Sequence, residues 1–128
     1  MTPSDTSRHD DSAKLHERLQ RMADILDPDF GFEPLAELTF EVTGDLAAFA
    51  RRCRLLWDIY IAGRLLRSGH LAEHGEASLR ARFAAEFAAL GGELDAAFDS
   101  VFRPLAPLRH RDLIDFARQV PVRASTTA

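Results

Sequence analysis

The sequence predicts an all-α protein, a compact bundle of four to six helices around one central apolar helix. Apolar residues recur at steps of three and four along most of the 128 residues, which is the helical period. Residues 55–66 are apolar around nearly the whole helical circumference except at Asp58 and Arg64. A helix of that kind is enclosed by other helices or shared with a partner. Nine phenylalanines and Trp57 supply a large aromatic core.

The composition is that of one ordinary globular domain, with 46% hydrophobic and 28% charged residues. We expect a disordered segment at 1–11, a single helical domain at 12–120 and a frayed tail at 121–128. Because neither a secretory signal nor an apolar span of membrane length is seen, the expected location is the cytoplasm. The single cysteine, Cys53, excludes an internal disulfide and is expected to pack in the core.

The first helix is predicted over 13–27, with Ser12 as its N-cap and Pro28 ending it. Its apolar residues follow one helical stripe: Leu15, Leu19, Met22, Ala23 and Leu26. The next segment, 29–43, is ambiguous. Residues 38–42 alternate as in a strand, but Leu35, Leu38 and Val42 also share one helical face. We favour a short helix, because a lone strand would have to pair with another chain.

The central helix is predicted over 44–68, with Thr43 as its cap and Gly69 at its end. Two apolar stripes run along it and diverge after Leu55: Leu46, Phe49, Cys53, Leu56 and Tyr60, and Leu55, Ile59, Ala62 and Leu66. Such a helix should contact both the first helix and the one that follows. Any surplus apolar surface is expected to face a second copy of the chain.

One kinked helix, or two nearly collinear helices, is predicted over 76–103. The apolar phase from Leu79 to Leu105 continues through the Gly91-Gly92 pair, and glycine pairs are a known cause of kinks. Pro104 and Pro107 then interrupt the helix. A last short helix is predicted over 109–120.

A weak metal site is a candidate at His70, Glu73 and His74. The run His70-Leu71-Ala72-Glu73-His74 resembles the His-x-x-Glu-His signature of the inverzincin metallopeptidases. That resemblance implies two imidazoles on a zinc ion and a glutamate that activates its water. The family's third ligand, a distant downstream glutamate, has no counterpart here, and Gly69 and Gly75 place the motif in a loop.

Asp58 is the charged residue within the apolar helix that most needs a partner, because an unpaired buried carboxylate is costly. Arg54 lies one turn before it and can reach it. Asp58, Arg54, Trp57 and Tyr60 are therefore the candidate residues for an interface or a ligand pocket.

Charge is segregated along the chain, which has a net charge of −4. Residues 24–45 carry seven acids and no base, whereas the central helix is rich in arginine. The two segments are expected to attract each other, or the acidic one to dock a basic protein. Residues 101–128 carry five arginines against two aspartates, but the whole chain is acidic and nucleic-acid binding is not favoured.

The function these patterns favour is protein–protein interaction, in a regulatory, adaptor or accessory role, by a homodimer. The alternative is an enzyme or a small-molecule-binding bundle with a pocket around the polar residues of the central helix. Enzymatic activity is the less favoured reading, and no cofactor and no membrane contact is predicted.

Overall fold

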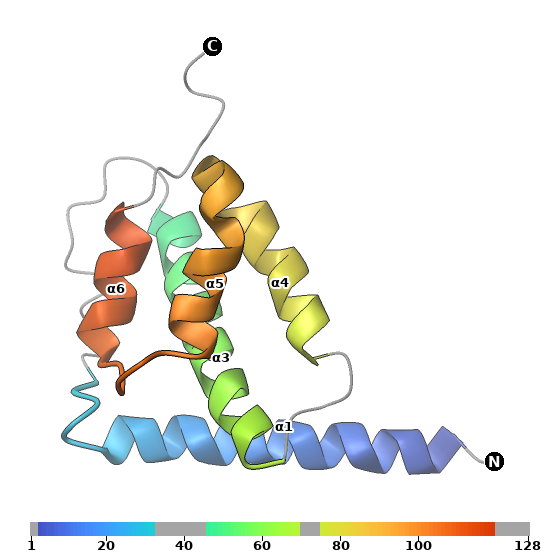
Figure 1. Cartoon of the computed structure of the whole chain (residues 1–128). Coiled ribbons are helices and arrows are strands. Elements are labelled where there is room, and N and C mark those ends of the chain that lie inside the picture. The colour runs from blue at the N-terminus through green and yellow to red at the C-terminus, as the bar shows by residue number, and fades with distance from the viewer. Residues whose placement is uncertain (1–2, 33–45, 70–74, 120–128) are drawn as a thin grey trace.

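The computed structural model describes residues 3–32, 46–69 and 75–119, and their regular structure is entirely helical. The elements are α1 (Pro3–Leu26), α3 (Leu46–Arg67), α4 (Gly75–Glu86), the 3-10 helix η1 (Ala88–Glu93), α5 (Leu94–Phe102) and α6 (His110–Gln119). Figure 1 shows α4, α5 and α6 packed around α3, with α1 lying across one end of the bundle. The predicted all-α bundle is confirmed.

Helix α3 is the centre of the bundle, as its sequence predicts, and its bounds lie within two residues of the predicted 44–68. Residues on every side of it are buried, among them Leu55, Leu56, Ile59 and Ile61. They are covered by α1, α4, α5 and α6 of the same chain. Cys53 is buried in this core, in agreement with its expected packing role.

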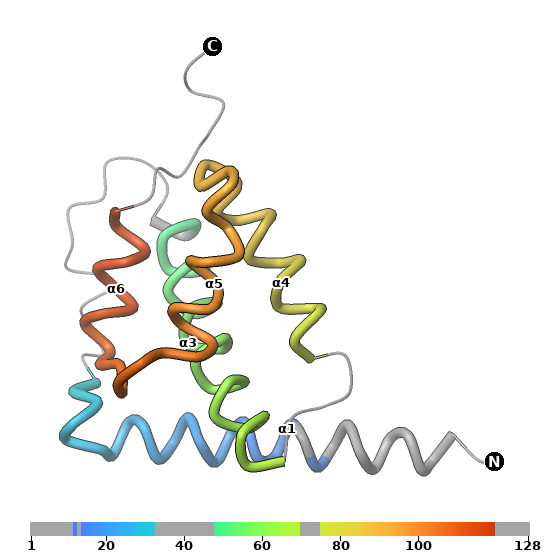
Figure 2. The backbone as a smooth tube through the Cα atoms, viewed as in Figure 1, coloured from blue at the N-terminus to red at the C-terminus, as the bar shows by residue number. Residues whose placement is uncertain are grey.

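The segment 76–103 is a helical hairpin, which corrects the prediction of one kinked helix or two nearly collinear ones. Figure 2 shows α4 and α5 side by side with the chain reversing at η1. The Phe83 and Phe98 rings pack edge to face, and Arg80 bonds to Asp99 across the pair. Gly91 makes the reversal possible because its φ of 57° lies in the left-handed region. The apolar phase survives because both helices face the same core.

Helices α3 and α5 approach each other closely at Gly63. A Cβ atom at this position would lie 1.9 Å from the carbonyl oxygen of Phe102, a distance that no packing accommodates. The same Phe102 carbonyl accepts a hydrogen bond from the Arg67 guanidinium at 3.2 Å. Arg67 thereby supplies a donor to a carbonyl at the C-terminal end of α5, where the last carbonyls of a helix have no N–H donor within the helix itself.

A buried arginine of α3 does the same for two further helices. Arg52 is 1% exposed and donates to the carbonyl of Glu86, the last residue of α4, and to that of Ala117 in the last turn of α6. Its guanidinium also stacks over the Phe87 ring. Burial lowers the pKa of Arg52 from its ordinary value, and the nearby Glu86 carboxylate opposes that effect. Because cations are favoured at helix C-termini, the Arg52 side chain stabilises the C-terminal ends of both α4 and α6.

The ends of the chain differ in how well they were predicted. Helix α6 agrees with the predicted 109–120, but α1 begins at Pro3, ten residues before the predicted start at 13. Ser12 lies inside α1 rather than at its N-cap, and the predicted division of the chain between residues 11 and 12 stays a prediction. Proline is favoured at a first helical position, where its fixed φ suits the turn. The alternatives for 29–43 and the cap at Thr43 fall mainly outside the described residues, and so does the tail 121–128.

Candidate functional site

Helix α1 is held on α3 by polar contacts. Asp24 is 2% exposed, and its carboxylate accepts a hydrogen bond from the Trp57 indole at 2.9 Å. The Arg64 guanidinium grips both oxygens of Asp24, at 2.7 and 2.6 Å. This bidentate geometry is the strongest form of an arginine–carboxylate pair. Asp24 thus fixes the C-terminal part of α1 on the central helix.

A second ion pair lies one turn earlier on α1. Arg21 donates to the carboxylate of Asp58 and stacks over the Trp57 ring with 4.7 Å between the guanidinium carbon and the ring centre. The Asp58 carboxylate also lies 3.5 Å from Arg54 and 3.7 Å from Arg82. The partners of Asp58 therefore belong to its own chain, which makes it a structural contact between α1 and the bundle.

The opposite side of α1 carries an apolar stripe that the described part of the chain leaves uncovered. We define the outer stripe as Leu15, Leu19, Met22 and Leu26, which are 54%, 54%, 58% and 79% exposed. Since successive helical residues are 100° apart, the centre of the outer stripe lies about 170° around α1 from Asp24 and about 130° from Arg21. Helix α1 is therefore inverted: its polar face docks on the bundle and its apolar face points outward.

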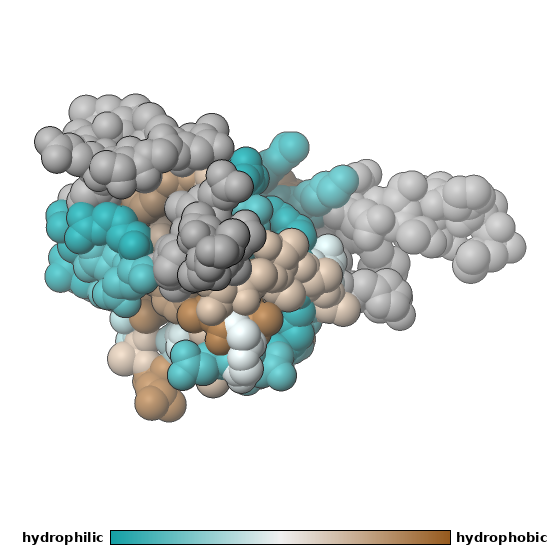
Figure 3. Space-filling view, turned by 90° about the horizontal axis from the view of Figure 1, so that it is seen from above, coloured by the Kyte–Doolittle hydropathy of each residue, from teal (hydrophilic) through white to brown (hydrophobic). Residues whose placement is uncertain are grey.

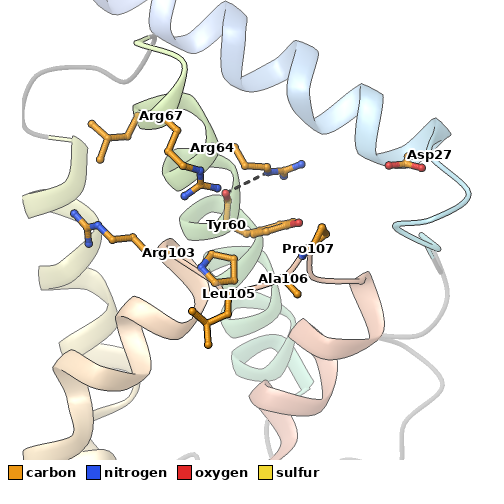
Figure 4. Close-up of a pocket in the computed structure, with 10 residues that line it drawn as sticks. Asp27, Tyr60, Arg64, Arg67, Arg103, Leu105, Ala106 and Pro107 are labelled. Atoms are coloured by element: carbon orange, nitrogen blue, oxygen red, sulfur yellow. Dashed lines mark hydrogen bonds between the residues drawn. The ribbon is translucent and has the colours of Figure 1, made fainter.

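A pocket of about 580 Å³ lies where the C-terminal end of α3 meets the α5–α6 connection. Figure 4 shows Arg67 reaching from α3 toward that connection, with Asp27 at the far side. The pocket is lined by Asp27, Tyr60, Arg64, Leu66, Arg67, Arg103, Pro104, Leu105, Ala106 and Pro107. The volume is in the range of small-molecule sites.

The connection that forms one wall of this pocket is held in place. The backbone N–H of Leu108 donates to the Tyr60 hydroxyl at 2.9 Å, and two prolines stiffen the segment before it. The side chain of Arg64 crosses the Tyr60 ring, 3.9 Å from its centre, on its way to Asp24. The pocket is thus built on fixed elements rather than on an open loop.

An aromatic cluster and a smaller pocket are two further candidate sites among the described residues. An aromatic cluster beneath α1 stacks His110 on Phe30 and Phe32, beside Trp57, and closes this part of the core. A smaller pocket of about 380 Å³ lies between η1, α5 and α6. Figure 3 views the end of the bundle opposite α1, where apolar and polar surface are intermixed. Neither feature gathers an acid, a base and a nucleophile in the manner of a catalytic site.

The structure divides the residues that the sequence grouped as a site between the contact with α1 and the larger pocket. Trp57 and Asp58 are engaged with α1, Arg54 is exposed beside Asp58, and only Tyr60 lines the larger pocket. The weak metal candidates His70, Glu73 and His74 lie outside the described residues. Among the residues that are described, no cluster of His, Cys, Asp and Glu could hold a metal ion.

Asp24, Arg64 and Arg67 carry the most important contacts, and sequence reasoning did not single them out. The pair Asp24–Arg64 spans 40 residues, so no helical spacing points to it. The one available signal was the segregation of charge, since Asp24 begins the acidic segment 24–45 and Arg64 lies on the arginine-rich helix. The attraction expected between these segments is present at this pair, whereas 33–45 lies outside the described part.

No described helix is both long enough and apolar enough to cross a membrane. No protein-family model, curated protein or solved structure matches the chain.

Proposed function

We propose that this protein is a helical interaction module that self-associates through the outer stripe of α1. The observation that carries the proposal is the inversion of α1, whose polar face is bound to α3 through Asp24 and Arg21 while its apolar face points outward. An amphipathic helix at the surface of a globular domain ordinarily buries its apolar side. The arrangement found here leaves that side available to a partner.

The spacing of the outer stripe supports another helix as the partner. Leu15, Leu19, Met22 and Leu26 are separated by four, three and four residues, which is the spacing of alternating core positions in a coiled coil. Ile25, also exposed, widens the stripe on one side. A helix with the same spacing can insert its side chains between these residues.

A second copy of the chain is the occupant we infer. Symmetric dimers use the same patch on both subunits, and α1 of a second copy presents the matching stripe. The sequence favoured a homodimer from surplus apolar surface on the central helix, but α3 is covered within its own chain. The basis for self-association therefore moves to α1. A regulatory or accessory role in the cytoplasm is the setting we propose for such a module.

The size of the stripe predicts a weak dimer. Covering a half-exposed side chain of this kind contributes about 1 kcal/mol, so the eight side chains of two copies contribute about 8–10 kcal/mol. Association costs at least about 4 kcal/mol in lost translational and rotational freedom. The difference corresponds to a dissociation constant between about 0.05 and 1 mM.

Sedimentation velocity over a concentration series up to about 1 mM, where this range of affinity becomes visible, tests the proposal. The wild type is expected to shift from monomer to dimer. Leu19→Glu combined with Met22→Glu should remain monomeric and folded, because glutamate is a good helix former and both positions are exposed.

The matched control is Ala84→Glu with Ala85→Glu, which adds the same charge at exposed positions of α4 and should leave the dimer intact. A wild type that stays monomeric over the whole range would overturn the proposal. Equal dimerisation of the two double variants would do the same.

A further inference from the structure

The exposed large apolar side chains of the described residues fall into two groups. Five lie on α1, in and beside the outer stripe, and the remaining two are Leu66 and Leu105. Both of these line the 580 Å³ pocket at the end of α3. The pocket therefore offers apolar surface that no other described residue covers.

The three arginines that line this pocket differ in whether a carboxylate pairs with them. Arg64 is neutralised by Asp24 at 2.6 Å, and Arg103 pairs with Glu76 at 3.2 Å and Asp99 at 3.1 Å. Arg67 differs from both, because it has no carboxylate partner among the described residues. Its side chain donates instead to the neutral carbonyl of Phe102. The end of the pocket at Arg67 thus carries a positive charge that no described residue around it balances.

Arg67 is also held in position. Its bond to the Phe102 carbonyl uses one N–H group, and the guanidinium keeps further donors on the same rigid plane. Such a plane matches the two oxygens of a carboxylate better than a flexible ammonium group does. Asp27 lines the opposite side, where its charge would repel an anion, so a ligand with one anionic end is oriented toward Arg67.

From this geometry we propose that the pocket binds an amphipathic carboxylate. The carboxylate lies on the guanidinium of Arg67, and the apolar body covers Leu66, Leu105 and the prolines of the α5–α6 connection. The walls are largely pre-formed, because Tyr60 holds Leu108 and the prolines restrict the backbone. This site is separate from the outer stripe and does not depend on dimer formation.

The test uses 4-phenylbutyrate as the probe, titrated into the full-length protein and followed by the chemical shifts of its backbone amides. Saturable binding is expected, with the largest shifts at Leu66, Arg67 and Leu105. The neutral analogue 4-phenylbutanamide should bind at least about tenfold more weakly, because it lacks the charge that Arg67 recognises. Inorganic phosphate, which has charge but no apolar body, should also bind more weakly than the probe.

Arg67→Met should weaken 4-phenylbutyrate binding at least about tenfold, since methionine keeps an apolar stem and removes the charge. The control Arg118→Met removes an exposed arginine of α6, away from the pocket, and should leave the affinity unchanged. Arg67→Lys is the second variant: it keeps the charge and loses the planar fork, and an intermediate affinity is expected.

Three results would overturn the proposal. They are an absence of saturable binding, equal affinities for the acid and the amide, and unchanged affinity in both Arg67 variants. Phosphate binding as tight as that of 4-phenylbutyrate would show a simple anion site and would overturn the amphipathic class of ligand.

Discussion

Replacing Asp24 with alanine removes the carboxylate that joins α1 to α3. The Trp57 indole then loses its acceptor, and an unsatisfied buried donor costs about 1–3 kcal/mol. Arg64 loses both of its bonds to Asp24. Breaking a fully buried pair costs about 3–5 kcal/mol, but the Arg64 side chain is 23% exposed and water can reach part of it. We therefore expect a loss of about 3 kcal/mol in the free energy of unfolding.

Urea unfolding followed by the fluorescence of Trp57, the one tryptophan of the chain, measures this loss beside the bonds concerned. Asp29→Ala is the matched control, because it removes an exposed acid a few residues away and should change stability by less than about 0.5 kcal/mol. Arg64→Met, combined with Asp24→Ala in a double-mutant cycle, should give a coupling energy of about 1–3 kcal/mol. Equal stabilities of Asp24→Ala and Asp29→Ala would refute the role given to this carboxylate.

Three further substitutions test the packing of α3, each by urea unfolding. Gly63→Ala should destabilise the protein by at least about 2 kcal/mol, because the added Cβ atom meets the Phe102 carbonyl. Gly92→Ala is the control, since its Cβ atom would have open space, and it should be tolerated. Similar losses of stability in both variants would contradict the close approach of α3 and α5. Arg52→Met should lower the free energy of unfolding by about 2 kcal/mol, because carbonyls at the ends of α4 and α6 lose this donor. The control Arg51→Met, at an exposed position, should lower it little. A larger loss in Arg51→Met than in Arg52→Met would exclude the capping role of Arg52. Tyr60→Phe should cost about 1 kcal/mol by leaving the Leu108 N–H without its acceptor, and an unchanged stability would show that this bond does not hold the α5–α6 connection.

The helices that carry a local apolar pattern were the predictable part of the fold. Helix α3 is apolar on every side and α6 lies between a proline-rich connection and Pro121, so both appear close to their predicted bounds. The hairpin of α4 and α5 was not predictable from phase, since two helices that face one core keep the same phase whether the chain continues or reverses. The reversal depends on the φ angle of Gly91, which periodicity does not report.

The orientation of α1 on the bundle could not be predicted from the sequence for a related reason. The stripe from Leu15 to Leu26 identifies an amphipathic helix, but it does not say which of its two faces meets the bundle. That choice is decided by Asp24 and Arg21, whose partners Arg64 and Asp58 lie 40 and 37 residues away. Pairs at such separations follow from the fold and leave no local spacing to recognise.

The candidate site shows the same division. Tyr60 was one of the candidate residues named from the sequence, and it lines the pocket. Arg67 was not, since one arginine among the 15 of this chain has no feature that sets it apart in sequence. Its position relative to Phe102 and Leu105 depends on how α5 and the following connection return to α3.

The central claim is that α1 pairs with α1 of a second copy through the outer stripe. Isotope-filtered NMR on a concentrated mixture of labelled and unlabelled chains tests it most directly, because only contacts between two copies are detected. The account predicts contacts between the Met22 methyl group of one chain and the stripe leucines of the other, at Leu15, Leu19 or Leu26. Intermolecular contacts confined to α5 or α6, or none at a concentration where the dimer is populated, would contradict it.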